Sequence, residues 1–404
     1  MLEESHIKAV IKDTNNEHLP QFLAADVTFN VYKHICQVYN ANMSKSIQEI
    51  FAMRLHQARK IENLSLRELS EAVGGEPSHT MISRYEKAET IPGGEVVAKL
   101  ALALKKSVDF FFRAYEVEFS ELSFRKKAKL SVGERRAIEE KARDFFSRYV
   151  EAEELVGQRL PCHPPFAGEE LTDADGVEEY AERLRSPEYW DIGNNPVPNL
   201  HQLIESNGIK VHEVDTEDQN FDGFSGKANG APIIVLAKWL DRNIPWKRMT
   251  AAHELGHVVL PIPEHLPERE QEDIVKPFAG AFLLPKKNFI EMFGKQRSRI
   301  SLGELIDLKA YYGVSIMAIM YRASQLGLIS QAYSKRFFMM ANKARWRSEG
   351  EPGDDSYRGE ESHGRLRQLV FQGVAEGEMS NSKGAALLDK DMDEFRGLFK
   401  ESYV

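Results

Sequence analysis

Cysteine is almost absent from this chain of 404 residues, which contains only Cys36 and Cys162. The two cysteines are far apart, and neither stands in the spacing of a metal or redox motif, so no disulfide framework is predicted. Free thiols are typical of a reducing compartment. We therefore expect a cytoplasmic protein.

Long hydrophobic runs are also missing. No stretch approaches the roughly 18 consecutive apolar residues that a transmembrane helix needs. The sequence begins Met1-Leu2-Glu3-Glu4 and lacks the basic-then-apolar pattern of a secretory signal. We expect no membrane among the partners of this protein.

An excess of positive charge is absent as well. Lys and Arg together number 53 against 62 Asp and Glu, which gives a formal net charge of −9. An acidic balance argues against non-specific coating of nucleic acid, but one face of one domain can still bind DNA. The composition, with 42% hydrophobic and 28% charged residues, is that of an ordinary globular protein. The length suggests two to three domains.

The pattern along the chain divides it into five segments. Residues 1–45 form a leader without a strong period, and residues 46–113 carry dense helical periodicity. Residues 114–171 are locally basic, and we expect them to be a helical linker. A second domain is predicted over 172–330, and a helical C-terminal region over 331–404.

The second domain is predicted to combine helices with a few short strands. Residues 209–214 alternate in polarity and 232–236 form an apolar run, as expected of strands. Helical spacing dominates from Trp246 to Leu328. Residues 348–363 are acidic, rich in glycine and without periodicity, so a loop is expected there. The fold class predicted for the whole chain is α+β.

An H-E-x-x-H motif stands at residues 253–257. On a helix, His253 and His257 lie on one face, one turn apart, where both imidazoles reach a single ion. Glu254 is placed to take a proton from a metal-bound water, which predicts a catalytic role. Zinc suits imidazole ligands and keeps a position for water. A chance match is the alternative, which the apolar helical flanks make less favourable.

A zinc site of this kind needs a third protein ligand. Four carboxylates begin the next predicted helix: Glu268, Glu270, Glu272 and Asp273. The simplest account of acidic residues at a helix start is a favourable interaction with the helix dipole. Composition alone does not choose a ligand among them.

The motif and its surroundings resemble the ImmA/IrrE family of zinc metallopeptidases. The resemblance rests on His253-Glu-Leu-Gly-His257 and on the acidic helix after it, which ends in Phe278-Ala-Gly-Ala-Phe-Leu-Leu-Pro285. It covers about residues 172–330. Upstream segments follow the family's order as well: 190–196, 209–211, 222–225 and 232–235.

The resemblance implies a mostly helical, zincin-like domain with a small β-sheet. It also implies a zinc ion, with manganese as the alternative metal. The family's glutamate ligand falls on Glu272, six residues before Phe278, and Glu270 is the alternative. Lys276 and Pro277 depart from the family pattern, and Pro277 is expected to kink the helix just after the ligand.

A group that stabilises the developing negative charge on the scissile carbonyl is also expected. Four residues qualify by type only, and the sequence does not choose among them: His265, Tyr311, Tyr312 and Arg322.

Residues 46–113 carry a five-helix pattern. Ser65 and Glu68 form a capping box at the start of the second helix, and Ser78 is expected to cap the third. The five helices are predicted at 47–60, 66–73, 78–86, 96–104 and 106–112.

This pattern resembles the Cro/C1-type, or XRE, helix-turn-helix family. The resemblance rests on Leu66-x-x-Leu69-x-x-Ala72 and Ile82-Ser-x-x-Glu86. It implies a close helix crossing at Ala72, a core position at Ile82 and a tie between helices at Glu86. In that family the start of the third helix enters the major groove. The DNA-contacting residues that follow are Ser78, His79, Thr80, Ser83, Arg84 and Lys87.

A helical bundle for dimerisation or substrate docking is the alternative for this domain, because its charges are nearly balanced. The basic stretch 124–148 has nine basic and four acidic residues. It either helps to hold phosphates or forms a solvated helix face.

These patterns predict a DNA-binding transcriptional regulator with zinc-dependent endopeptidase activity. Peptidases of the resembling family typically cleave XRE-type repressors encoded nearby, often under DNA-damage or mobile-element control. The expected partners are operator DNA and a repressor-like protein, cleaved in trans or within this chain. The alternative is an XRE transcription factor, or an antitoxin with a cognate toxin, whose zincin domain senses a ligand or partner without proteolysis. Symmetric operators would imply a homodimer.

Overall fold

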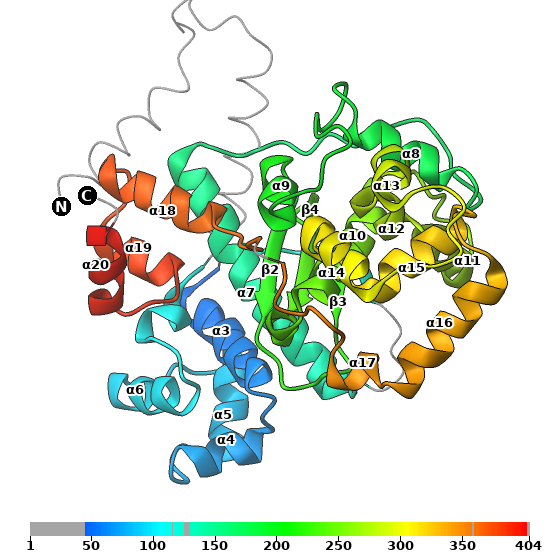
Figure 1. Cartoon of the computed structure of the whole chain (residues 1–404). Coiled ribbons are helices and arrows are strands. Elements are labelled where there is room, and N and C mark those ends of the chain that lie inside the picture. Colours follow the sequence, from blue (N-terminus) through cyan, green and yellow to red (C-terminus); the bar gives the residue numbers. More distant parts are fainter. Residues whose placement is uncertain (1–44, 115, 125–129, 358, 402–404) are drawn as a thin grey trace, which may run out of the picture.

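The computed structural model describes residues 45–114, 116–124, 130–357 and 359–401 (Figure 1). The fold is α+β, as predicted: many helices surround one four-stranded sheet. The predicted leader, 1–45, lies almost entirely outside the described residues. No helix within the described part of the chain has the length and apolar character required to cross a bilayer.

The N-terminal domain is a bundle of short helical elements, blue and cyan in Figure 1. They are α3 (Ile47–Ile61), α4 (Leu66–Ala72), α5 (His79–Glu86), α6 (Gly94–Ala103) and the 3-10 helix η1 (Val108–Phe112). The five predicted helices are thus confirmed within a few residues at each end.

Caps and core contacts fix this bundle. Ser65 and Glu68 make the predicted capping box, and the Ser78 hydroxyl accepts from the backbone N–H of Met81 at 3.4 Å. Ile82 is fully buried in the core that joins the helices. Arg59 of α3 donates to both carboxylate oxygens of Glu86 at 2.6 Å, so Glu86 does tie two helices together.

The expectation for Ala72 is wrong. Ala72 is exposed at the end of α4, and the buried residues of that helix are Leu69 and Ser70. The Ser70 hydroxyl donates to the carbonyl oxygen of Pro77 at 2.9 Å, so the contact between α4 and the start of α5 runs through Ser70.

The sheet has the order β1-β3-β4-β2. β3 and β4 form an antiparallel hairpin across Asn229 and Gly230, whose positive φ angles of 47° and 76° suit a tight two-residue turn. β2 is parallel to β4, and β1 is antiparallel to β3. The strands are β1 (Phe119–Phe124), β2 (Lys210–Val214), β3 (Gly223–Ala228) and β4 (Ala231–Ala237).

The structure differs from the expected linker at 114–171. This stretch supplies the edge strand β1 and the helix α7 (Val132–Val156), which packs on the sheet. Ile138, Phe146 and Val150 recur at helical spacing and are buried against the sheet residues Val214 and Phe224. Because basic residues stand between these positions, the sequence alone does not reveal that they form one apolar helix face.

The basic stretch 124–148 contributes internal contacts as well as exposed charge. Arg143 donates to the carbonyl oxygen of Val117 at 3.1 Å, and its guanidinium lies 4.7 Å from the ring centre of Phe119. Arg148 is buried and pairs with Asp144 at 3.2 Å. These two cations are therefore not free to hold phosphates, and residues 125–129 lie outside the described residues.

The second domain surrounds α10, the helix that carries the H-E-x-x-H motif. α10 packs on β3 and β4 on one side and on α12 on the other. Its Leu255 belongs to the same core as Ile234 of the sheet and Phe278 of α12. The elements are α8 (Val177–Arg185), α9 (Leu200–Ser206), η2 (Lys238–Arg242), α10 (Ile244–Val259), α11 (Glu268–Val275), α12 (Phe278–Leu283), α13 (Lys286–Phe293), α14 (Leu302–Tyr312) and α15 (Ile316–Gln325).

The C-terminal region divides between two cores. Phe337 of α16 joins the core around α10, whereas Leu369 and Val370 of α18 pack against Tyr149 of α7. Figure 1 shows α18, α19 and α20, in orange to red, beside α7. The helices are α16 (Gln331–Lys343), α17 (Trp346–Glu349), α18 (Arg365–Ala375), α19 (Asn381–Leu387) and α20 (Met392–Glu401).

Candidate metal centre

The motif helix α10 has well-defined ends. The side chain of Asn243 accepts from the backbone N–H of Trp246 at 3.0 Å, and Pro245 occupies the first turn, where no N–H partner is needed. The helix stops at Val259, and Pro261 follows two residues later. The motif therefore lies in the last two turns of a helix that the sheet holds in place.

Gly256 allows the next helices to approach the motif closely. A Cβ at this position would lie 3.0 Å from the side chains of Val275 and Phe278, which is tighter than normal packing. Val275 ends α11, and Phe278 begins α12. The missing side chain thus brings the end of α11, and with it Glu272, close to α10.

His253, His257 and Glu272 come together at this junction. Glu272 Oε1 lies 3.0 Å from His257 Nε2, and Glu272 Oε2 lies 3.6 Å from His253 Nε2. Two ligands at about 2.05 Å from a tetrahedral zinc ion are about 3.3 Å apart, so both separations suit a shared ion. The three residues form one of two groups with metal-binding geometry among the described residues.

The charge on Glu272 is stabilised within this cluster. The neighbouring imidazoles, of His253 first and then of His257, hold the pKa of the Glu272 carboxyl well below its usual range, against the effect of partial burial. A carboxylate beside two imidazoles is a donor set that zinc prefers. The residues present therefore fit the metal that the motif implies.

Glu254 is buried, with 1% of its surface exposed, and follows His253 directly on α10. It belongs to the motif but not to the three-residue cluster. Glu254 is thus a second buried carboxylate at this end of α10, separate from the carboxylate of Glu272, which faces both histidines.

The other carboxylates of α11 are exposed. Glu268, Glu270 and Asp273 are solvent-facing, and Asp273 forms an ion pair with Lys276. Glu270, the alternative ligand, is outside the cluster. Of the four carboxylates at this helix, the structure brings only Glu272 to the histidines.

Lys276 and Pro277 separate α11 from α12, so the helix is interrupted at the position where a kink was expected. Glu272 lies one turn before the break, and its carboxylate still lies beside both imidazoles. The departure from the family pattern therefore does not remove the third donor.

Two of the four residues considered as charge stabilisers have structural contacts. Arg322 donates to both carboxylate oxygens of Glu178 at 2.6 and 2.7 Å and is buried. The Tyr312 hydroxyl donates to the Asn288 side chain at 2.6 Å. His265 and Tyr311 are exposed, and no contact with the cluster distinguishes either one.

The residues predicted to contact DNA lie at the start and along one side of α5. Ser78, His79, Thr80, Arg84 and Lys87 are exposed, and Ser83 is half-buried. Arg84 pairs with the exposed Glu89 at 3.2 Å. The opposite side of α5 faces the core through Ile82 and Tyr85, so the predicted contact residues lie at the surface of the described part of the chain.

Comparison with known families matches both regions. Residues 204–324 match the peptidase M78 family, described as the IrrE N-terminal-like domain, and residues 55–111 match a helix-turn-helix family. No curated protein and no solved structure matches the chain. The chain thus joins an XRE-type helix-turn-helix domain to an IrrE/ImmA-like domain, in the predicted order. The domains suggest a DNA-binding regulator and a metallopeptidase-like module.

Proposed function

We propose that this protein is a DNA-binding regulator with metal-dependent endopeptidase activity. The observation that carries the proposal is the meeting of His253, His257 and Glu272, with Glu254 next to the first histidine on the same helix. Zinc is the proposed metal, and manganese is the alternative.

In the proposed reaction His253, His257 and Glu272 would hold the metal, which when bound would lower the pKa of a water ligand and polarise the scissile carbonyl. Glu254 accepts the proton from the attacking water. Glu254 then returns the proton to the departing amine, as a general acid. The burial of Glu254 on α10 restricts the rotamers that its side chain can adopt.

The proposed substrate is a repressor-like protein, cleaved in trans or within this chain. Support comes from the joining of a helix-turn-helix domain and a peptidase-like domain in one polypeptide. The test incubates the full chain with zinc or manganese, alone and with XRE-type repressors from neighbouring genes, and follows fragments by mass spectrometry. Wild type should produce a fragment that Glu254→Gln does not. Identical fragment patterns for the two proteins would exclude the proposal.

Glu270→Gln is the matched control for this test, because Glu270 is an exposed carboxylate on the helix that carries Glu272. Its cleavage rate should equal that of wild type. The zinc content of all three proteins must be measured in parallel, so that loss of metal is not mistaken for loss of the base.

DNA binding is proposed to use the exposed side of α5. Arg84→Ala should weaken binding to DNA from the protein's own promoter by about 1–3 kcal/mol if Arg84 contacts a base. Lys99→Ala, an exposed cation on α6, is the control and should bind as wild type does. Equal affinities for Arg84→Ala and wild type would contradict this assignment.

A second candidate is a regulator or antitoxin whose metal domain senses a ligand or a partner such as a toxin without proteolysis. The burial of both His253 and Glu254 favours it, because a substrate must reach this carboxylate for cleavage. Full zinc binding without any Glu254-dependent fragment would support the sensor.

A further inference from the structure

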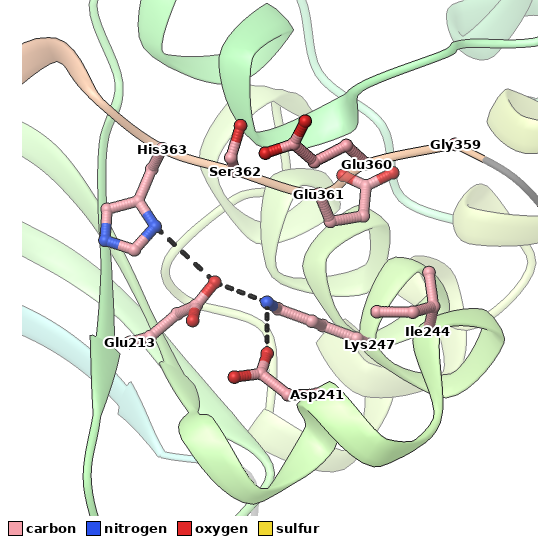
Figure 2. Close-up of a pocket in the computed structure, with 9 residues that line it drawn as sticks. All are labelled: Glu213, Asp241, Ile244, Lys247, Gly359, Glu360, Glu361, Ser362 and His363. Carbon is pink, nitrogen blue, oxygen red and sulfur yellow. Dashed lines mark hydrogen bonds and ion pairs between the residues drawn. The ribbon is translucent and has the colours of Figure 1, made fainter. Parts of the chain in front are cut away.

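A second cluster of histidine and carboxylate side chains lies where α9 packs on β2, the edge strand that pairs in parallel with β4. His201 belongs to α9, Glu213 to β2, and His363 to the segment between α17 and α18. The family match begins at residue 204 and ends at 324, so two of the three residues lie outside it. Figure 2 shows Glu213 and His363 as an ion pair in the lining of one cavity.

The separations in this cluster suit a tetrahedral metal ion. His201 Nδ1 lies 3.3 Å and His363 Nδ1 lies 3.4 Å from Glu213 Oε1. Ligands at about 2.05 Å from a tetrahedral zinc ion are about 3.3 Å apart. The three donor atoms all lie within 4.8 Å of one another.

His201 is fully buried, and neither of its ring nitrogens has a hydrogen-bond partner among the described residues. Buried polar atoms are nearly always satisfied, because an unsatisfied donor or acceptor costs about 1–3 kcal/mol. Its Nδ1 faces Glu213 in a geometry that is close but not that of a hydrogen bond. A metal ion between them would satisfy this nitrogen.

The segment that carries His363 is anchored on both sides of this residue. Glu361 accepts from the backbone N–H groups of Leu200 and His201, at 2.8 and 3.2 Å. Beyond His363, the backbone N–H of Gly364 donates to Glu205 at 3.0 Å. His363 is therefore held beside α9 before any ion binds, which lowers the entropic cost of binding.

The ammonium group of Lys247 already forms an ion pair with Glu213. Its Nζ lies 2.5 Å from Glu213 Oε1 and 2.6 Å from Asp241 Oδ1. Figure 2 marks both contacts with dashed lines. Asp241 is half-exposed and can keep the ammonium when an ion approaches Glu213. The adjoining cavity, of about 440 Å³ and lined by Asp241 and Glu360, has room for an ion and a water ligand.

We propose that His201, Glu213 and His363 form a second divalent-metal site, of zinc type, that fastens the segment 359–364 to α9 and β2. Water from the cavity supplies the fourth ligand. The site is independent of the proposed peptidase activity and uses none of its residues. The imidazole centres of His201 and His363 are 6.3 Å apart, compared with 5.0 Å for His253 and His257, so binding should draw His363 inward.

Metal stoichiometry of the full chain tests the proposal. The protein is stripped with a chelator, reloaded with zinc and desalted, and zinc per chain is measured by mass spectrometry. Wild type should retain two ions, His363→Gln one, His257→Gln one and the double variant none. His163→Gln, at an exposed histidine outside both clusters, should retain two.

Cobalt absorption gives a second readout. In His257→Gln, cobalt should still show the visible bands of a tetrahedral site, and adding His363→Gln should remove them. Wild type that binds one ion or two, none of which His363→Gln removes, would overturn the proposal. Loss of both ions in His363→Gln would also overturn it, because the residue would then act on the fold rather than as a ligand. Absence of peptidase activity would leave these outcomes unchanged.

Discussion

The two clusters use the same donors, two histidines and one glutamate, but reach them in different ways. In the first, His253 and His257 share one helix, and Glu272 follows on the next. In the second, His201 and His363 are separated by most of the second domain and meet only because Glu361 and Glu205 hold the later segment against α9. A site built on one helix is set by local geometry, whereas the second depends on the whole fold.

The two clusters also differ in the positively charged or neutral groups that face their glutamate. Lys247 already neutralises Glu213 at the second cluster, at 2.5 Å, whereas Glu272 faces two imidazoles. An ion at the second cluster must therefore compete with a resident ammonium. We expect the first cluster to bind zinc more tightly.

The largest expected effect separates metal binding from proton transfer at the first cluster. Glu254→Gln should lower the rate of substrate cleavage by about 10²–10⁴-fold, because a general base contributes that much. Zinc content should remain that of wild type, since Glu254 is outside the ligand group. Cleavage kinetics and metal analysis on the same preparation check both statements. A variant that loses zinc and activity together would show that Glu254 helps to build the site.

Breaking the ion pair that anchors the C-terminal segment beside the second cluster should destabilise the protein. Arg248 and Glu361 form an ion pair in which both side chains are fully buried. Glu361→Gln leaves the buried Arg248 charge without a carboxylate partner and should cost about 3–5 kcal/mol of unfolding free energy. Denaturant titration measures this cost. Glu360→Gln, its exposed neighbour, should have little effect.

Closing the space at Gly256 should weaken the first cluster alone. Gly256→Ala places a Cβ 3.0 Å from Val275 and Phe278, so the end of α11 must move away from α10. Overpacking of this kind costs about 1–3 kcal/mol. Displacement of Glu272 should lower zinc affinity at the first cluster, measured by competition with a chelating dye. Unchanged affinity would mean that α11 follows α10 without needing this close contact.

Removing the resident cation should strengthen the second cluster. Lys247→Gln takes a positive charge from beside Glu213, and changes around a metal shell shift affinity by roughly 10- to 100-fold. Zinc titration of the variant in a His257→Gln background isolates this site. A weaker affinity than in the His257→Gln parent would show that Lys247 orders Glu213 rather than competes with metal.

Local patterns were sufficient for much of the fold and for most of the first cluster. The i, i+4 spacing placed His253 and His257 on one helical face, and the capping residues Ser65 and Ser78 marked two helix starts. The choice of Glu272 as the third ligand rested on the family resemblance, because the four carboxylates on α11 have similar local sequence patterns. In the structure, Gly256 allows the close approach of Val275 at the end of the helix that carries Glu272.

Features that depend on distant contacts were not predictable in the same way. The apolar face of α7 is interrupted by arginines such as Arg143 and Arg148, which have partners only in the folded chain. The second cluster had no motif, since His201, Glu213 and His363 have no characteristic spacing. A glycine-rich acidic segment like 348–363 indicates a loop, but not the helix against which that loop packs.

Zinc-edge anomalous scattering from crystals of the full chain tests the central claim most directly. The account predicts one peak between His253, His257 and Glu272, and a second between His201, Glu213 and His363. A map without a peak at the first position would contradict the assignment of this domain as a metal-dependent peptidase.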